Sequence, residues 1–141
     1  MLIRILALVL CSALFTPANG QNDTESLPIV TKFECPKCPE KARSLHIEGV
    51  VIMQITTDGH GVSGVKVLRA AGVLAPYAEA NVRTWKFTDH LPTTFTVTYD
   101  YAFEGNYKQD PATKCDAKMD LPKSVKVSTE RPPIQDSPRP R

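Results

Sequence analysis

The clearest pattern in the sequence is a strict alternation of apolar and polar residues between positions 94 and 103. The polar positions carry mostly threonine, and the others carry large apolar residues: Phe95, Val97, Tyr99, Tyr101 and Phe103. Side chains of a β-strand point to opposite faces in turn, so this pattern predicts a strand with one buried face. Large aromatic residues at such spacing are expected in the core rather than on a platform that stacks sugars or bases.

A second pattern predicts a β-hairpin nearer the N-terminus. Two runs rich in β-branched residues, 50–56 and 62–68, flank the sequence Thr57-Asp58-Gly59-His60-Gly61. Asp-Gly between two such runs favours a tight turn, because both residues tolerate the backbone angles that the turn requires. The two runs are therefore expected to be antiparallel neighbours in a sheet.

Helical spacing is found on either side of this hairpin. Four apolar residues recur at intervals of four, four and three, which places them on one face of a helix that Pro76 could begin: Leu74, Ala78, Val82 and Trp85. A shorter helix is expected from Pro39 to about His46, with an apolar edge formed by Ala42 and Leu45.

The predicted elements come in the order helix, strand, strand, helix, strand. With short connections, this order favours an α+β fold in which a three-stranded antiparallel sheet is covered on one face by two helices. The segment 124–129, behind Leu121-Pro122, offers a short fourth strand at an edge of that sheet.

The first twenty residues have the features of a secretory signal peptide. Arg4 gives a positive start, positions 5–15 are almost entirely apolar, and Ala18-Asn19-Gly20 offers small residues to a signal peptidase. We expect export and cleavage after Gly20. The alternative is an uncleaved membrane anchor, although this apolar run is shorter than the roughly 20 residues that a membrane-spanning helix needs.

The rest of the chain divides by composition into four parts. A flexible leader is expected over 21–34, a folded domain over 35–105, an extension with an edge strand over 106–130, and a disordered proline- and arginine-rich tail over 131–141. The 17 basic and 15 acidic residues nearly balance, so we expect no nucleic-acid partner. No catalytic set stands out from the sequence, which predicts a non-enzymatic protein without a cofactor.

Removal of the signal segment would leave three cysteines: Cys35, Cys38 and Cys115. Export favours a disulfide, and an odd number leaves one thiol unpaired. The preferred interpretation is that one of the first two cysteines pairs with Cys115 and ties the C-terminal segment back to the first helix. The alternatives are a thiol–disulfide redox protein that uses Cys35-x-x-Cys38, and a zinc site completed by a histidine: His46, His60 or His90.

Five short motifs in register resemble the C-terminal domain of TonB-type energy transducers and their stand-alone relatives. The similar stretch runs from about Cys38 to Phe103. It comprises Pro39-Glu40-Lys41-Ala42-Arg43, Ile47-Glu48-Gly49-Val50-Val51, the turn from Thr57 to Val62, the strand from Val65 to Ala70, and Arg83-Thr84-Trp85-Lys86-Phe87. The Cys35-x-x-Cys38 motif and all residues after Gly105 lie outside it.

The resemblance implies a protein-binding role in the periplasm of a Gram-negative cell envelope. Members of that family hold a short peptide segment of an outer-membrane receptor, which adds to an exposed sheet edge by β-augmentation. The matching edge here would be the strand 94–103, represented by Thr94, Thr96, Thr98 and Asp100. A second copy of the chain could occupy the same edge, and a membrane would be reached only through a partner or an uncleaved signal. A purely structural envelope domain is the further alternative.

Overall fold

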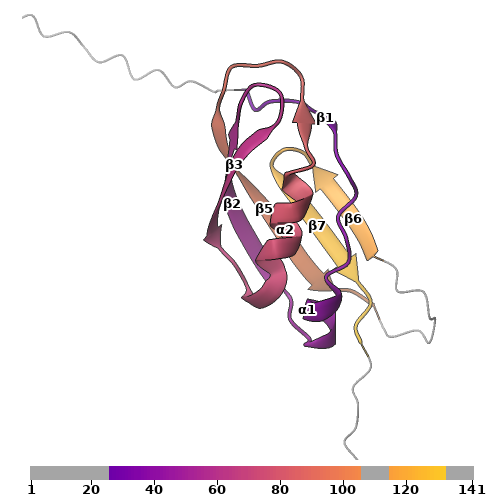
Figure 1. The fold of residues 1–141 in the computed structure, drawn as a ribbon. Coiled ribbons are helices and arrows are strands. Elements are labelled where there is room, and N and C mark those ends of the chain that lie inside the picture. Colours follow the sequence, from indigo (N-terminus) through magenta and orange to yellow (C-terminus); the bar gives the residue numbers. More distant parts are fainter. Residues whose placement is uncertain (1–25, 106–114, 133–141) are drawn as a thin grey trace, which may run out of the picture.

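The computed structural model describes residues 26–105 and 115–132. The expected signal segment, most of the leader and nearly all of the tail lie outside these residues. The described part contains seven strands, two short α-helices and a 3-10 helix, and Figure 1 shows both helices in front of one face of the larger sheet. No described helix is long and apolar enough to cross a membrane.

The larger sheet has five strands in the order β3-β2-β5-β7-β6. Their bounds are Gly49–Thr57 for β2, Val62–Arg69 for β3, Thr94–Phe103 for β5, Cys115–Asp120 for β6 and Ser124–Thr129 for β7. A second sheet pairs β1 (Val30–Lys32) with β4 (Lys86–Phe87).

The three strands predicted from sequence form one half of the larger sheet. β2 pairs antiparallel with β3 on one side and with β5 on the other, in a register that places Met53 opposite both Val67 and Val97. Residues that share a register position share a face, so the apolar residues of the alternating pattern meet on the inner side. The apolar inner face of β5 follows directly from the period of two in the sequence.

The other half of the sheet is a hairpin formed by β6 and β7. β7 lies parallel to β5, from Thr98 opposite Ser124 to Phe103 opposite Thr129, and β6 pairs antiparallel with β7. Val125 and Val127 lie on the inner face and are buried. The hairpin therefore extends the hydrophobic core as well as the sheet.

The helices close the inner face. α1 is Glu40–Ser44, and α2, Ala75–Val82, follows the 3-10 helix η1, Gly72–Leu74. Side chains from α2 and the sheet make one core, whose largest fully buried members are Trp85, Tyr99, Met53, Ile55 and Leu74. Trp85 lies just beyond the end of α2, so the helix is shorter than its apolar spacing predicted.

The predicted fold class is wrong. Over residues 26–105 and 115–132 the protein is mainly β, with a mixed five-stranded sheet instead of a three-stranded antiparallel one and only two short α-helices. The prediction missed β6, because the strand alternates half-buried residues with charged ones and so carries a weak apolar signal. It also placed 124–129 at an edge, whereas β7 lies between β5 and β6. Val30–Lys32, which was expected in the flexible leader, forms β1.

Candidate functional site

The strand predicted to accept a partner, β5, lies in the interior of the sheet. The N–H group of Thr98 donates a hydrogen bond of 3.0 Å to the carbonyl oxygen of Lys123, and the pairing with β7 continues to Phe103. At Thr98 and Asp100 the strand therefore already has a paired neighbour on each side. Only the first half of β5, with Thr94 and Thr96, precedes the β7 ladder, and β2 flanks it on its other side.

The side chains of these four residues point to the face of the sheet opposite the helices. They alternate with buried residues, and Thr94 and Thr96 are exposed while Thr98 and Asp100 are half-buried. The four residues do share one face, as the alternation predicted, but together they do not form an edge.

The edges of the sheet, in the part of the chain that the structure describes, are β3 and β6. Figure 1 shows them at opposite borders of the sheet. An edge strand presents N–H and C=O groups that can pair with an added strand, unless charge, bulges or a cover prevents this. The two edges differ in this respect.

The β6 edge carries the features that oppose strand addition. Asp116, Lys118 and Asp120 are exposed along it. Its first residue, Cys115, is bonded to Cys38, so β6 is also fixed to the segment that precedes α1. Charged side chains on a short edge strand are a common protection against pairing with other chains.

The β3 edge is longer and less charged. Its eight residues include Val62, Val65 and Val67, which are half-buried against the core, and the only charged residues are Lys66 and Arg69. Irregular register marks both ends of its ladder with β2, but the register is regular from Met53 opposite Val67 to Thr56 opposite Gly64. β3 thus offers a regular central stretch.

The direction of the backbone N–H and C=O groups in that stretch can be inferred, because successive residues of a strand direct these groups to opposite sides. Thr98 directs its N–H toward β7, so the odd-numbered residues of β5 pair with β2. The even-numbered residues of β2, such as Gln54, must then pair with β3 at Lys66. The backbone groups of Val65 and Val67 consequently point away from the sheet.

The hairpin tip between β2 and β3 is held by the loop that leads into β5. The Oδ1 atom of Asp58 accepts hydrogen bonds of 2.9 Å from the N–H groups of both His60 and Gly61. These two N–H donors, Gly61 first, lower the pKa of the Asp58 carboxyl group. The N–H group of His90 in turn donates to the carbonyl oxygen of Gly59 at 3.2 Å.

Two histidines lie at this tip. Nδ1 of His60 is 2.8 Å from Oδ1 of Asp89, and Nε2 of His90 is 2.7 Å from Oγ1 of Thr57. The sequence named both histidines as candidate zinc ligands and predicted neither partner: Asp89 lies 29 residues from His60, and Thr57, the last residue of β2, lies 33 residues from His90. Thr57 is buried, so its hydroxyl is not open to a substrate.

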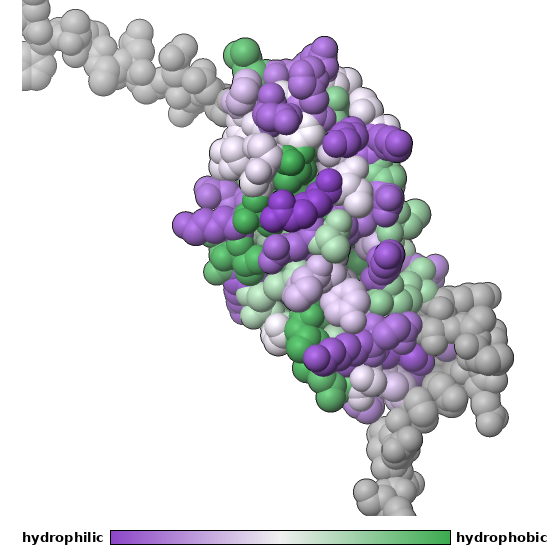
Figure 2. Space-filling model, viewed as in Figure 1, coloured by the Kyte–Doolittle hydropathy of each residue, from purple (hydrophilic) through white to green (hydrophobic). Residues whose placement is uncertain are grey.

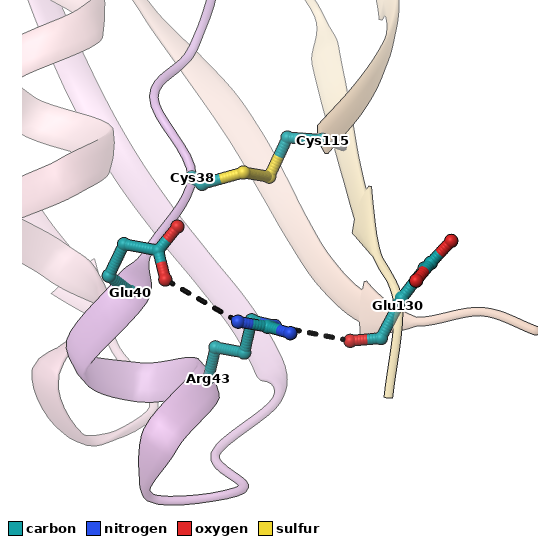
Figure 3. The surroundings of a disulfide bond; sticks show 5 residues. All are labelled: Cys38, Glu40, Arg43, Cys115 and Glu130. Carbon is teal, nitrogen blue, oxygen red and sulfur yellow. Dashed lines mark hydrogen bonds and ion pairs between the residues drawn. A yellow bond between two sulfur atoms is a disulfide. The ribbon is translucent and has the colours of Figure 1, made fainter. Parts of the chain in front are cut away.

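The disulfide joins Cys38 to Cys115, with a Cα–Cα distance of 5.6 Å. Figure 3 shows it between the start of α1 and the start of β6, beside the hydrogen bond from Nε of Arg43 to the carbonyl oxygen of Glu130. The predicted link from the Cys35-x-x-Cys38 motif to Cys115 is confirmed. In a dithiol redox site the two cysteines of the motif would pair with each other.

Cys35 is the unpaired cysteine of the described residues, and it is exposed. It lines a pocket of about 250 Å³ beside α2, together with Tyr77 and Asn81. No group of three or more histidine, cysteine or acidic residues within 26–105 and 115–132 has an arrangement that could hold a metal ion. The zinc hypothesis is weakened further because Cys38 and Cys115 are consumed by the disulfide.

The helix-bearing face offers no broad apolar platform. Figure 2 shows hydrophobic residues on the viewed side in separate areas divided by hydrophilic ones. The exposed large hydrophobic residues of the described chain are scattered along the sequence, and only Leu68 belongs to a strand: Ile29, Phe33, Leu45, Leu68 and Leu91. Single exposed apolar residues are normal and do not define a docking site.

Together these observations define the class: a small, mainly β domain with a disulfide clip and one comparatively open sheet edge. Comparison with known proteins gives no match, either among protein-family models or among curated proteins. The resemblance to the TonB C-terminal family therefore stays a prediction from the motifs.

Proposed function

We propose that this chain is an exported, non-enzymatic protein-binding domain that holds an extended peptide along β3. The observation that carries the proposal is the outward direction of the backbone groups of Val65 and Val67 on an edge strand. An added strand would gain main-chain hydrogen bonds from these residues.

The disulfide supports the part of this proposal that places the protein in an oxidising compartment outside the cytosol. Disulfides persist in oxidising environments such as the periplasm and are rare in the cytosol. The bond between Cys38 and Cys115 therefore agrees with the signal-like segment at residues 1–20.

The partner that the motif resemblance favours is a segment near the N-terminus of an outer-membrane receptor, or a similar segment of another envelope protein. Such a segment would bind in extended form, and its side chains would alternate between the two faces of the sheet. On the face opposite the helices they would lie beside Lys66, so an acidic residue at that position of the peptide would add a favourable charge.

The experiment uses receptor N-terminal peptides that are N-methylated at alternate residues. In one series the methyl groups replace the N–H groups that would point to β3, and in the other series those that point away. β-augmentation predicts that the first series loses binding at least about tenfold, since each lost hydrogen bond is worth about 1 kcal/mol and the methyl groups also clash. The second series should bind nearly as well as the unmodified peptide.

The matching protein variant is Val65→Pro, which removes an N–H group that points out of the sheet. Proline is tolerated on an edge strand where the N–H faces away from the ladder, so the fold should persist, as circular dichroism can check. Val65→Ala is the control, because it also shortens the half-buried side chain but keeps the outward N–H group. Equal affinities of both methylated series, or no peptide binding by a folded monomer, would refute the proposal. A dimer without peptide would instead place a second copy at β3.

A further inference from the structure

The helix α1 has little apolar attachment to the rest of the fold. It contains five residues, of which only Ala42 is buried, and no side chain caps its N-terminus. Its ties to other elements are polar or covalent: Arg43 to the carbonyl oxygen of Glu130 at 3.4 Å, and the N–H of Lys41 to the hydroxyl of Tyr77 at 3.3 Å. The disulfide of Cys38, two residues before the helix, is therefore the strongest connection between α1 and β6.

At the end of the sheet near the disulfide, the core of the described chain also contains polar groups that lack hydrogen-bond partners. Thr129 lies directly opposite Cys115, and Tyr101 lies on the neighbouring strand opposite Val127. Their hydroxyl groups are buried, and among the described residues neither has a hydrogen-bond partner. Each buried hydroxyl without a partner costs free energy of folding, which the disulfide helps to offset at this end of the sheet.

A free thiol lies three residues before the disulfide. Cys35 is exposed, and residues 33–39 belong to no helix or strand. The segment is anchored just before Cys35, because Glu34 accepts a hydrogen bond of 2.8 Å from Nδ2 of Asn81 and donates one of 3.1 Å to Oγ1 of Thr84. The thiol is thus three residues from Cys38 in the sequence, on a stretch that belongs to no strand or helix.

We propose that Cys35 exchanges with this disulfide and so makes the clip a reversible latch. The Cys35 thiolate attacks Sγ of Cys38, a Cys35–Cys38 bond forms as the Cys38–Cys115 bond breaks, and Cys115 leaves as thiolate. The proton lost by Cys35 is balanced by the one that Cys115 takes up. The chain keeps one disulfide and one thiol throughout, so no oxidant or reductant is consumed.

Exchange would free β6 from the segment that precedes α1. β6, a charged six-residue edge strand, would then be held by its pairing with β7 and by the partly buried Cys115 and Met119. Local opening is easiest where few buried apolar contacts oppose it. This inference concerns the β6 border of the sheet and does not depend on peptide binding at β3.

Tryptic mapping can read the pairing directly. Lysines separate the three cysteines onto different peptides: 33–37 carries Cys35, 38–41 carries Cys38 and 115–118 carries Cys115. The chain without residues 1–20, and so without Cys11, is reduced, reoxidised in a thiol–disulfide buffer under native conditions, alkylated rapidly and digested. Exchange predicts two linked pairs, 38–41 with 115–118 and 33–37 with 38–41. Finding only the first pair, with Cys35 fully alkylated, would overturn the proposal.

Two variants test whether Cys35 is the attacking thiol and whether the disulfide holds β6 in place. In Cys35→Ser the second pair must vanish while the first remains, because no attacking thiol is left. In Cys115→Ser the chain can form only the Cys35–Cys38 bond, and hydrogen exchange of the β6 amides should accelerate at least about tenfold while β2 stays protected. Unchanged protection of β6 in a folded Cys115→Ser protein would show that the disulfide does not latch this strand.

Discussion

The hydroxyl group of Tyr99 donates a hydrogen bond of 2.7 Å to Oδ1 of Asn81, inside the core. Through its Nδ2 atom the same Asn81 binds the carbonyl oxygen of Glu34. One buried amide therefore joins the central strand β5, the helix α2 and the extended segment that carries Cys35. It is a structural link that apolar periodicity gave no reason to expect.

Tyr99→Phe should lower the free energy of unfolding by about 1–3 kcal/mol, because it leaves Oδ1 of Asn81 buried without a donor. Tyr101→Phe is the matched control: the Tyr101 hydroxyl is buried without a partner, so its removal should be neutral or stabilising. Urea denaturation of both variants measures the difference. Equal losses would mean that the Asn81 hydrogen bond contributes nothing specific.

The disulfide is expected to carry a large share of the stability. It links residues that are 77 positions apart, and a loop of that length corresponds to about 4 kcal/mol in the chain-entropy description. The double variant Cys38→Ser/Cys115→Ser should lose about this amount in denaturant unfolding. Cys35→Ser, which removes only the exposed thiol, should stay within about 0.5 kcal/mol of the parent. A double variant as stable as the parent would contradict the prediction.

Gly59 is required by the hairpin tip. Its φ is +102°, and a Cβ atom there would lie 2.7 Å from the carbonyl oxygen of His90. Gly59→Ala should therefore destabilise the protein by about 1–3 kcal/mol through backbone strain and the clash. Gly64→Ala is the control, since a Cβ there would meet Thr56 at an ordinary 3.6 Å. Parallel thermal melting should show a lower Tm for Gly59→Ala than for Gly64→Ala, and equal Tm values would contradict the prediction.

Alkaline pH should destabilise the fold. Burial raises the pKa of Tyr99 and of Tyr101 above the ordinary value of 10.0. The unfolded chain releases these phenolic protons near pH 10 while the native chain retains them, so the stability that is present below that pH declines as the pH rises above it. Ultraviolet titration should show both tyrosines ionising only as the circular-dichroism signal is lost. Ionisation of all tyrosines near pH 10 in a folded chain would contradict this.

Local pattern predicted four of the seven described strands, β2, β3, β5 and β7. The alternation at 94–103 gave the bounds of β5, and 124–129 gave those of β7. The Asp-Gly turn gave the β2–β3 hairpin, because neighbouring strands joined by a tight turn leave little choice of partner. The burial of Trp85 and Tyr99 likewise followed from size and spacing.

The candidate site was less predictable. Whether a strand is an edge depends on every other strand in the sheet, and β6 has a weak signal of its own. Without β6 and the parallel pairing of β7, β5 looked like a border strand, and Thr98 and Asp100 looked available to a partner. The link between the Cys35-x-x-Cys38 motif and Cys115 was expected from cysteine number, but which of the two would pair was left open.

The sequence by itself determined where β2, β3, β5 and β7 lie and which side of β5 is apolar, because both properties depend on residues a few positions apart. Only the tertiary structure decided the strand order, the free borders and the cysteine that pairs with Cys115. These depend on contacts between segments dozens of residues apart, such as Tyr101 with Val127 and Cys38 with Cys115. A periodic pattern records that a face must be buried, but not which segment buries it.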